Sequence, residues 1–262
     1  MGEENKIIAA IAIGACLLLF MALTLVLFFF LTKKKLIQKE LEKKSMELAY
    51  QDRVIQSAIL AQEDERRRIA QDLHDAISAK LNVISLTTHV LQADDKVTPK
   101  QNNALQHILN VTDKTLENSR KLAHNLLPPT LEKFGLVPAL EELFEEFTET
   151  SDLTITHNID HLPFLDKSKE VHVFRIIQEL INNAIRHGKA DHLNIQIHSN
   201  AESYTIVFKD NGVGFDVSAV KKESGIGLQN IKSRATILNG ALHMESVQHQ
   251  GSTFTINCDI HG

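Results

Sequence analysis

Residues 63–75 read EDERRRIAQDLHD, a charged helical turn and an apolar step that lead to a histidine followed at once by an aspartate. They lie within residues 36–91, a segment that contains neither proline nor glycine. One position recurs there every seven residues, at Leu41, Leu48, Ile55, Gln62 and Ile69. Such a repeat predicts a coiled coil. We expect a parallel dimer stalk rather than one solvated helix, because a lone helix has nothing against which to bury that stripe.

The segment before this stalk has the composition of a transmembrane helix. The run from Ile7 to Leu31 carries no charge, and at about 1.5 Å per residue it would span a hydrocarbon core of about 30 Å. A signal peptide is the alternative, but the leader MGEENK is not basic and no small-residue cleavage site follows. Lysines cluster after the run, whereas Lys6 alone precedes it. The positive-inside rule therefore predicts a single-pass protein of the cell (inner) membrane, with residues 1–6 outside and the C-terminal bulk in the cytoplasm.

The chain beyond the stalk divides into a helical part and a mixed part. Residues 93–102 are polar, contain a proline and break the helical pattern; a second amphipathic stretch then runs to Pro128-Pro129. Two helices joined by a loop form a hairpin, and two copies would form a four-helix bundle. Further on, strand-like alternation near residues 153–155, 193–197, 206–208 and 254–260 is interspersed with helical patterns at 136–147, 169–187 and about 226–239. This second part predicts an α/β sandwich.

Composition excludes several classes of site and partner. The chain has 262 residues and a formal net charge of -5, which allows one or two domains and gives no sign of nucleic-acid binding. It has two cysteines, Cys16 in the apolar run and Cys258 in an alternating strand pattern. We therefore expect neither a disulfide framework nor a cysteine-based metal site.

His74 is the candidate nucleophile. An imidazole with a pKa near 6.5 is largely neutral at cytoplasmic pH and can attack phosphorus. Asp75 could hold the ring's Nδ1–H, leaving Nε2 free to attack, or accept the proton. Adjacent residues on a helix do not share a face, so a direct contact between the two is not assured.

Three later segments together predict a site for a magnesium nucleotide. In QELINNAIRH (178–187), Glu179 and Asn183 are four residues apart and share a helix face, and an amide oxygen suits Mg²⁺. In DNGVGF (210–215), a carboxylate at the end of a strand can accept a hydrogen bond from the adenine amine, and the glycines allow close approach. In GIGL (225–228), the glycines precede a helix whose N-terminal amides favour phosphates.

The whole set of motifs resembles the sensor histidine kinases of the nitrate-sensor type, over about residues 60–260. ERRRIAQDLHD resembles the phosphoacceptor box of that subfamily, and LLPPTLEKFGLVPALEEL (126–143) resembles its junction between domains. QELINNAIRH resembles the asparagine box, and DNGVGF and SGIGLQNI resemble the two glycine boxes of the GHKL-type ATP-binding domain. GSTF (251–254) resembles the closing GTxF, with Ser252 in place of threonine.

The resemblance implies a role for each candidate residue. His74 would be phosphorylated with the help of Asp75; Asn183 would hold Mg²⁺; Glu179 would support the phosphate end, as a catalytic residue; and Asp210 would bind adenine. Residues 216–224 would form a short mobile lid. The remaining residues of the ATP site would be His187, Gly212, Gly214, Gly225, Gly227, Leu228, Ser252 and Thr253.

The sequence thus predicts an α+β multidomain protein. We expect an extracytoplasmic N-terminus, a transmembrane helix, a coiled-coil stalk, a dimerisation and phosphotransfer domain, and an ATP-binding domain, at residues 1–6, 7–31, 32–62, 63–127 and 128–262. The predicted activity uses ATP and Mg²⁺ to phosphorylate His74 in a homodimer and passes the phosphoryl group to an aspartate of a cytoplasmic response regulator. The alternatives are a GHKL-type ATPase, which would not need His74-Asp75, and a signalling pseudokinase, which should have lost nucleotide residues.

One position departs from the subfamily pattern. The subfamily often carries glutamine or histidine four residues after the aspartate of the phosphoacceptor box, and that side chain is implicated in dephosphorylating the regulator. Here the fourth residue after Asp75 is Ala79. The resemblance therefore puts a strong phosphatase activity in doubt without affecting the kinase activity.

Overall fold

The computed structural model describes residues 2–94, 96–162, 164–217 and 225–260. The chain divides into two compact units, Met1–Val54 and Ile55–Gly262. Both contain part of one long helix, α1 (Glu3–Asp72).

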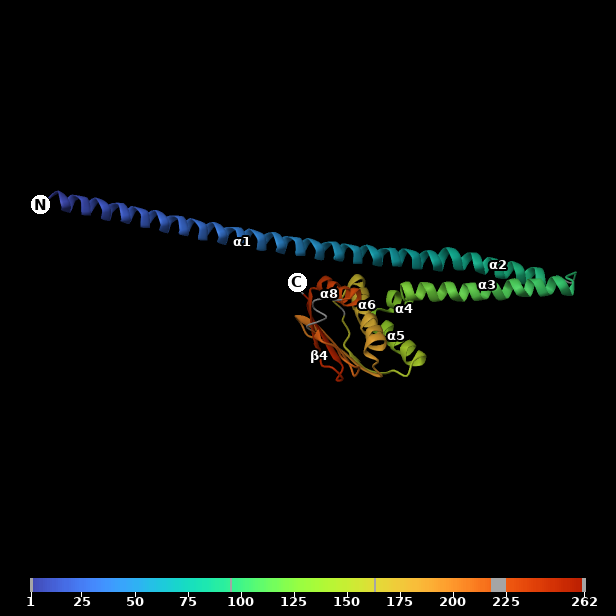
Figure 1. The fold of residues 1–262 in the computed structure, drawn as a ribbon. Helices are drawn as coiled ribbons and strands as arrows, with labels where there is room; N and C mark the ends of the chain where they lie inside the picture. The colour runs from blue at the N-terminus through green and yellow to red at the C-terminus, as the bar shows by residue number, and fades with distance from the viewer. Residues whose placement is uncertain (1, 95, 163, 218–224, 261–262) are drawn as a thin grey trace. The chain divides into compact units, whose positions relative to one another are not determined.

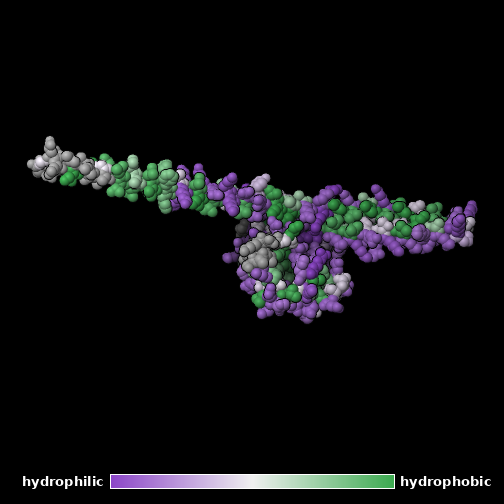
Figure 2. Space-filling model, in the orientation of Figure 1, coloured by the Kyte–Doolittle hydropathy of each residue, from purple (hydrophilic) through white to green (hydrophobic). Residues whose placement is uncertain are grey.

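The first unit consists of the N-terminal part of α1 (Figure 1). The most apolar part of this helix is not buried within the chain. Figure 2 shows the described side chains of this stretch as a mostly green, hydrophobic surface. A buried core helix of a soluble domain would be covered. Among the helices that the structure describes, this is the one long and apolar enough to cross a membrane.

The second unit opens with a helical hairpin. The end of α1 passes through a π-helical turn, η1 (Leu73–Ile77), into α2 (Ser78–Gln92), and α3 (Pro99–Leu126) returns beside α2 (Figure 1). The loop between them is shorter than predicted, because α3 begins at Pro99. Thr98 caps this helix: its backbone N–H donates to Gln101 Oε1 at 2.9 Å, and its hydroxyl accepts from the Gln101 N–H. Proline suits the first helical position, where no N–H is needed.

The hairpin leaves an apolar face uncovered in the single chain (Figure 2). On α2 the side chains of Val83, Leu86 and Val90 are 63–68% exposed. Their spacing of three and four residues places them on one side of the helix. On α3 the large exposed apolar residues are Ile108, Val111 and Leu122.

The C-terminal domain is the α/β sandwich that the sequence predicts. It starts with α4 and α5, and a five-stranded sheet has the order β1-β2-β3-β5-β4, in which only β1 and β2 are parallel. Its elements are α4 (Pro129–Phe134), α5 (Leu136–Thr150), β1 (Thr154–Ile159), α6 (Lys167–Asn183), η2 (Ala184–Gly188), β2 (His192–Ser199), β3 (Ser203–Asp210), α8 (Ile226–Ile237), β4 (Gly240–Ser246) and β5 (Ser252–Asp259).

The core of this domain lies between the sheet and the helices α5, α6 and α8. Alternate residues of β2 and β3, among them Ile195, Ile206 and Phe208, are fully buried there. The buried face of α6 packs against them with Ile176 and Ile177. This core fixes the positions of β3, α6 and α8. The ends of β3 and α6 and the start of α8 meet at the candidate site.

Candidate active site

A cavity of about 510 Å³ lies between the end of α6, the loop after β3 and the start of α8. Glu179 and Asn183 line it from α6, one helical turn apart, as their spacing predicts. Asp210 reaches it from the end of β3, and Gly225 and Gly227 border it at the start of α8. Residues that the sequence separates by almost 50 positions therefore surround one cavity.

Asp210 is the buried carboxylate of this cavity, with 4% of the residue exposed. The Gly212 N–H donates to its Oδ1 at 2.8 Å, and the Ser252 hydroxyl donates to its Oδ2. Each carboxylate oxygen can accept two hydrogen bonds. The carboxylate is thus fixed in orientation and keeps acceptor capacity for a ligand amine.

Glycines allow the backbone to close around the cavity. A Cβ at Gly227 would lie 2.4 Å from Glu179 Oε1, and one at Gly212 would lie 2.3 Å from the Gly188 carbonyl oxygen. Gly214 adopts a φ of 63° and approaches the Val247 carbonyl. A side chain at any of these three positions would displace the walls of the cavity.

A second π-helical turn, η2, follows Asn183 directly. It brings the Gly188 carbonyl oxygen within 2.8 Å of the Val213 N–H, which ties η2 to the glycine loop after β3. The turn also places Arg186 and His187 at the cavity. π-Helical turns are rare and are frequent at functional sites.

The structure brings most of the predicted nucleotide residues together. Nine of them line the cavity: Glu179, Asn183, His187, Asp210, Gly214, Gly225, Gly227, Leu228 and Ser252. Gly212 lies beside them, under Asp210. Thr253 is not among the lining residues, because successive residues of β5 point to opposite faces and it is Ser252 and Phe254 that line the cavity. Of the predicted lid, residues 218–224 lie outside the described residues.

Several lining residues were not predicted individually. Asn182 and Arg186 fall within the quoted QELINNAIRH motif, and Phe215 ends DNGVGF, so each was close to a recognised position. Phe254 lies on β5, where its ring makes an edge-to-face contact with Phe208 of the neighbouring strand β3. Phe254 also ends the quoted GSTF motif, and the alternation of β5 was a further signal, since it faces the same side as Ser252.

The arrangement fits a magnesium nucleotide. The buried carboxylate suits an adenine amine, the glycines permit close approach, and the N-terminus of α8 presents backbone amides to phosphates. Within the described residues, no group of three or more His, Cys, Asp or Glu could hold a metal. Mg²⁺ is commonly bound by one or two protein ligands together with substrate phosphates, and Asn183 is placed to be such a ligand.

His74 does not line this cavity and lies on the helical hairpin. It is exposed on η1, next to the exposed Asp75. The Ser78 backbone N–H and the Ser78 hydroxyl both donate to the Leu73 carbonyl oxygen, the hydroxyl at 3.1 Å, and so close this π-helical turn. His74 borders a separate cavity of about 520 Å³, whose other walls include Arg120, Lys121 and His124 of α3. Among the residues that the structure describes, the two cavities share no lining residue.

Comparisons with known proteins match the helical hairpin and the C-terminal domain separately. A family model described as histidine kinase matches residues 65–131. A second, described as histidine kinase-, DNA gyrase B-, and HSP90-like ATPase, matches residues 168–261. The first therefore covers the helical hairpin with His74, and the second covers the nucleotide cavity.

The chain is also similar to individual proteins. The sensor histidine kinase LiaS of Bacillus subtilis is 35% identical over 202 residues, which are 75% of this chain and 54% of that protein. The chain thus spans about half the length of this curated relative. Solved structures that resemble it include a histidine kinase domain from the blue-light activated kinase EL346 of Erythrobacter litoralis (TM-score 0.47, 11% identity, 70% of this chain and 95% of that one). Another is the histidine kinase AdeS of Acinetobacter baumannii (TM-score 0.41, 18% identity, 73% and 98%).

Proposed function

We propose that this chain, which belongs to the two-component sensor histidine kinases of the nitrate-sensor type, transfers the γ-phosphoryl group of ATP to Nε2 of its own His74. The observation that carries the proposal is that Asn183, Asp210 and Gly227 line one cavity in the same chain that presents His74 on an exposed helix. An ATPase that only drives a conformational cycle has no use for the second feature.

Each group of the nucleotide cavity has a distinct task. Asp210 would accept a hydrogen bond from the adenine amine, which selects adenine over a base that presents an acceptor there. The amides at the start of α8 would bind the phosphates. Mg²⁺, when bound through Asn183, would neutralise phosphate charge. Glu179 lies one turn from Asn183 on the same side of α6 and would support the phosphate end of the site.

The transfer itself needs a neutral imidazole. Nε2 of His74 forms the new bond to phosphorus as the bond between the γ-phosphorus and its bridging oxygen breaks, and ADP leaves with that electron pair. The phosphorylated ring then carries a proton on Nδ1. Asp75, adjacent on η1, would stabilise or accept this proton. A second transfer, from His74 to an aspartate of a response regulator, would restore the free imidazole.

The same proposal includes the assembly and the membrane. The uncovered face of the hairpin, with Val83, Leu86 and Val90, would be buried against a second copy in a homodimer. The apolar part of α1 would cross the cell membrane once, with the lysine-rich side in the cytoplasm.

The test is incubation of the full chain with γ-labelled ATP and Mg²⁺. We expect label that is lost in acid and retained in alkali, as phosphohistidine is, and that moves to a response regulator added afterwards. Label that resists acid, or hydrolysis of ATP without any protein label, would contradict the proposal.

A further inference from the structure

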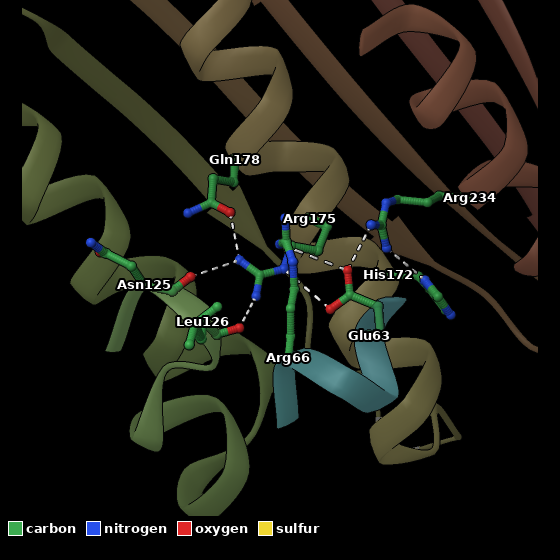
Figure 3. A network of polar contacts seen from close by, with 8 residues as sticks. All are labelled: Glu63, Arg66, Asn125, Leu126, His172, Arg175, Gln178 and Arg234. Carbon is green, nitrogen blue, oxygen red and sulfur yellow. Dashed lines mark hydrogen bonds and ion pairs between the residues drawn. The ribbon is translucent and has the colours of Figure 1, made fainter. Parts of the chain in front are cut away.

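Glu63 connects the phosphoacceptor helix, the continuous helix of α1 and η1 that carries His74, to the C-terminal domain (Figure 3). It lies on α1, eleven residues before His74, and its side chain is 10% exposed. Its Oε1 accepts from Arg234 of α8 at 2.7 Å, and its Oε2 lies 3.5 Å from Nε of Arg175 on α6. One carboxylate thus contacts both of the helices that build the nucleotide cavity.

The two arginines are also buried and have further partners. The side chains of Arg175 and Arg234 are 5% and 8% exposed. Arg175 donates to Gln178 at 2.7 Å, and Arg234 lies 3.0 Å from Nδ1 of His172. Burial lowers the pKa of His172 to about 4, with the charge of Arg234 acting in the same direction. His172 is therefore neutral at cytoplasmic pH, which leaves Glu63 as the carboxylate that balances these arginines.

Arg175 also holds the other helix of the hairpin. Its guanidinium donates to the carbonyl oxygens of Asn125 and Leu126, in the last turn of α3 (Figure 3). Carbonyls at a helix C-terminus lack partners within the helix and favour a cation. The C-terminal domain is therefore fastened to both helices of the hairpin, and Ala70 of α1 adds a buried apolar contact.

Electrostatic attraction between Glu63 and the two arginines stabilises this contact. Burial raises the pKa of the Glu63 carboxyl, but the arginines Arg175 and Arg234 outweigh burial and hold that pKa below its usual value. Glu63 is therefore ionised in the contact. Loss of its charge would leave two buried guanidinium groups without their carboxylate, and separation of the domain from the hairpin would return them to water.

His74 is not among the residues that line the nucleotide cavity. It borders a different cavity, and the described lining residues of the two cavities do not overlap. On α6, Arg175 precedes Glu179 by one turn, and on α8, Arg234 follows Gly227 by seven residues. A restraint on these two side chains therefore acts directly on the elements that carry the nucleotide residues.

We propose that Glu63 restrains phosphoryl transfer: by binding Arg175 and Arg234 together, it holds the C-terminal domain against the phosphoacceptor helix in an arrangement that does not present the nucleotide to His74. This inference rests on the proposed function and adds a means of regulation to it. Because Glu63 belongs to the same helix as the apolar segment, a rotation or shift of α1 that withdraws its carboxylate would release the domain.

The test compares Glu63→Gln, Arg234→Gln and the double variant with Asp64→Asn in the full chain in lipid nanodiscs. Asp64 is the matched control, because it is the next residue on α1, carries the same charge and is exposed. Two quantities are measured: the initial rate of histidine labelling from ATP, and the hydrogen exchange of residues 59–70 and 123–127 without nucleotide.

We expect Glu63→Gln and Arg234→Gln each to speed labelling by about tenfold, the factor that one hydrogen bond to a charged group contributes to an equilibrium. Both should also raise hydrogen exchange in the two segments. The double variant should gain no more than the better single variant, because both substitutions break one contact, and Asp64→Asn should match the wild type.

Labelling that is unchanged or slower in Glu63→Gln would overturn the restraint, as would additive gains in the double variant. Hydrogen exchange also separates this inference from the proposed function. Faster exchange in Glu63→Gln, with no label in any variant, would support the contact and contradict the kinase activity. Unchanged hydrogen exchange in Glu63→Gln with normal labelling would support the kinase activity and contradict the contact.

Discussion

Ser252 donates a hydrogen bond to Asp210 across the strand pair β3–β5, although 42 residues separate the two in sequence. Together with the Gly212 N–H on the other carboxylate oxygen, it sets the rotation of a buried acid at the nucleotide cavity. An amide in place of the carboxylate would have to turn its NH₂ group toward one of these two donors.

Asp210→Asn should therefore weaken ATP binding. The substitution removes a charge-assisted hydrogen bond to the adenine amine, which is worth about 1.5–3 kcal/mol, or about one to two decades of affinity. Asp259→Asn is the matched control, because Asp259 lies exposed at the opposite end of β5. Calorimetric titration with ATP measures the difference. Equal affinities of Asp210→Asn and the wild type would show that Asp210 does not bind adenine.

Two glycines at the start of α8 should differ in their tolerance of alanine. A Cβ at Gly227 would lie 2.4 Å from Glu179 Oε1 and 3.6 Å from the Asn183 amide nitrogen, whereas one at Gly225 would meet no atom of the described residues within 4 Å. We expect Gly227→Ala to displace Glu179 and to lower the labelling rate about 10²-fold or more, as loss of a positioning group does. Gly225→Ala should lose much less. Thermal unfolding of both variants checks that the domain remains folded, and similar rates would refute the steric argument.

The uncovered face of the hairpin should form the dimer. Leu86→Glu combined with Val90→Glu places two charges where the side chains are now 66–68% exposed and apolar. Burial of such a side chain is worth about 1.5–3 kcal/mol, so the dimer should weaken by several decades. Asn103→Glu, an exposed polar position on α3, is the control. Light scattering on residues 36–262 measures the mass, and a monomeric wild type at micromolar concentration would contradict the prediction.

Phosphatase activity toward the phosphorylated regulator should be weak. Ala79 is exposed at the start of α2, four residues after Asp75, and a methyl group cannot orient water. Positioning groups typically contribute about 10²–10⁴-fold, so Ala79→Gln should accelerate phosphate release. The assay uses purified phosphorylated regulator with ADP and without ATP, and it tracks reverse transfer separately. Rapid release by the wild type that Ala79→Gln leaves unchanged would show that this position does not limit the reaction.

Local patterns were sufficient to predict the elements that build the cavity. The four-residue spacing of Glu179 and Asn183 places both on one side of α6, and the end of an alternating strand places Asp210 at the cavity edge. These features depend on helix and strand periodicity, which neighbouring residues set. The α/β sandwich followed from the same periodicities.

Features that depend on distant partners could not be predicted in this way. The strand β4 reads GALHMES, with only Leu242 and Met244 as large apolar residues, and it lies at the edge of the sheet. Glu63 sits among charged residues that suggest a solvated helix surface, yet its partner Arg234 is 171 residues away. The polar run at 93–102 indicated a longer loop because Pro99 was taken as part of that loop, whereas it begins α3.

The central claim is that His74 receives the phosphoryl group, and the most direct measurement is the labelling of His74→Gln with γ-labelled ATP. Glutamine keeps a polar side chain on the exposed η1 turn, so nucleotide binding in its separate cavity should remain intact. His107→Gln, an exposed histidine on α3, serves as the control and should label normally. We predict that His74→Gln takes up no acid-labile label while it still binds ATP. Undiminished labelling of that variant would contradict the account.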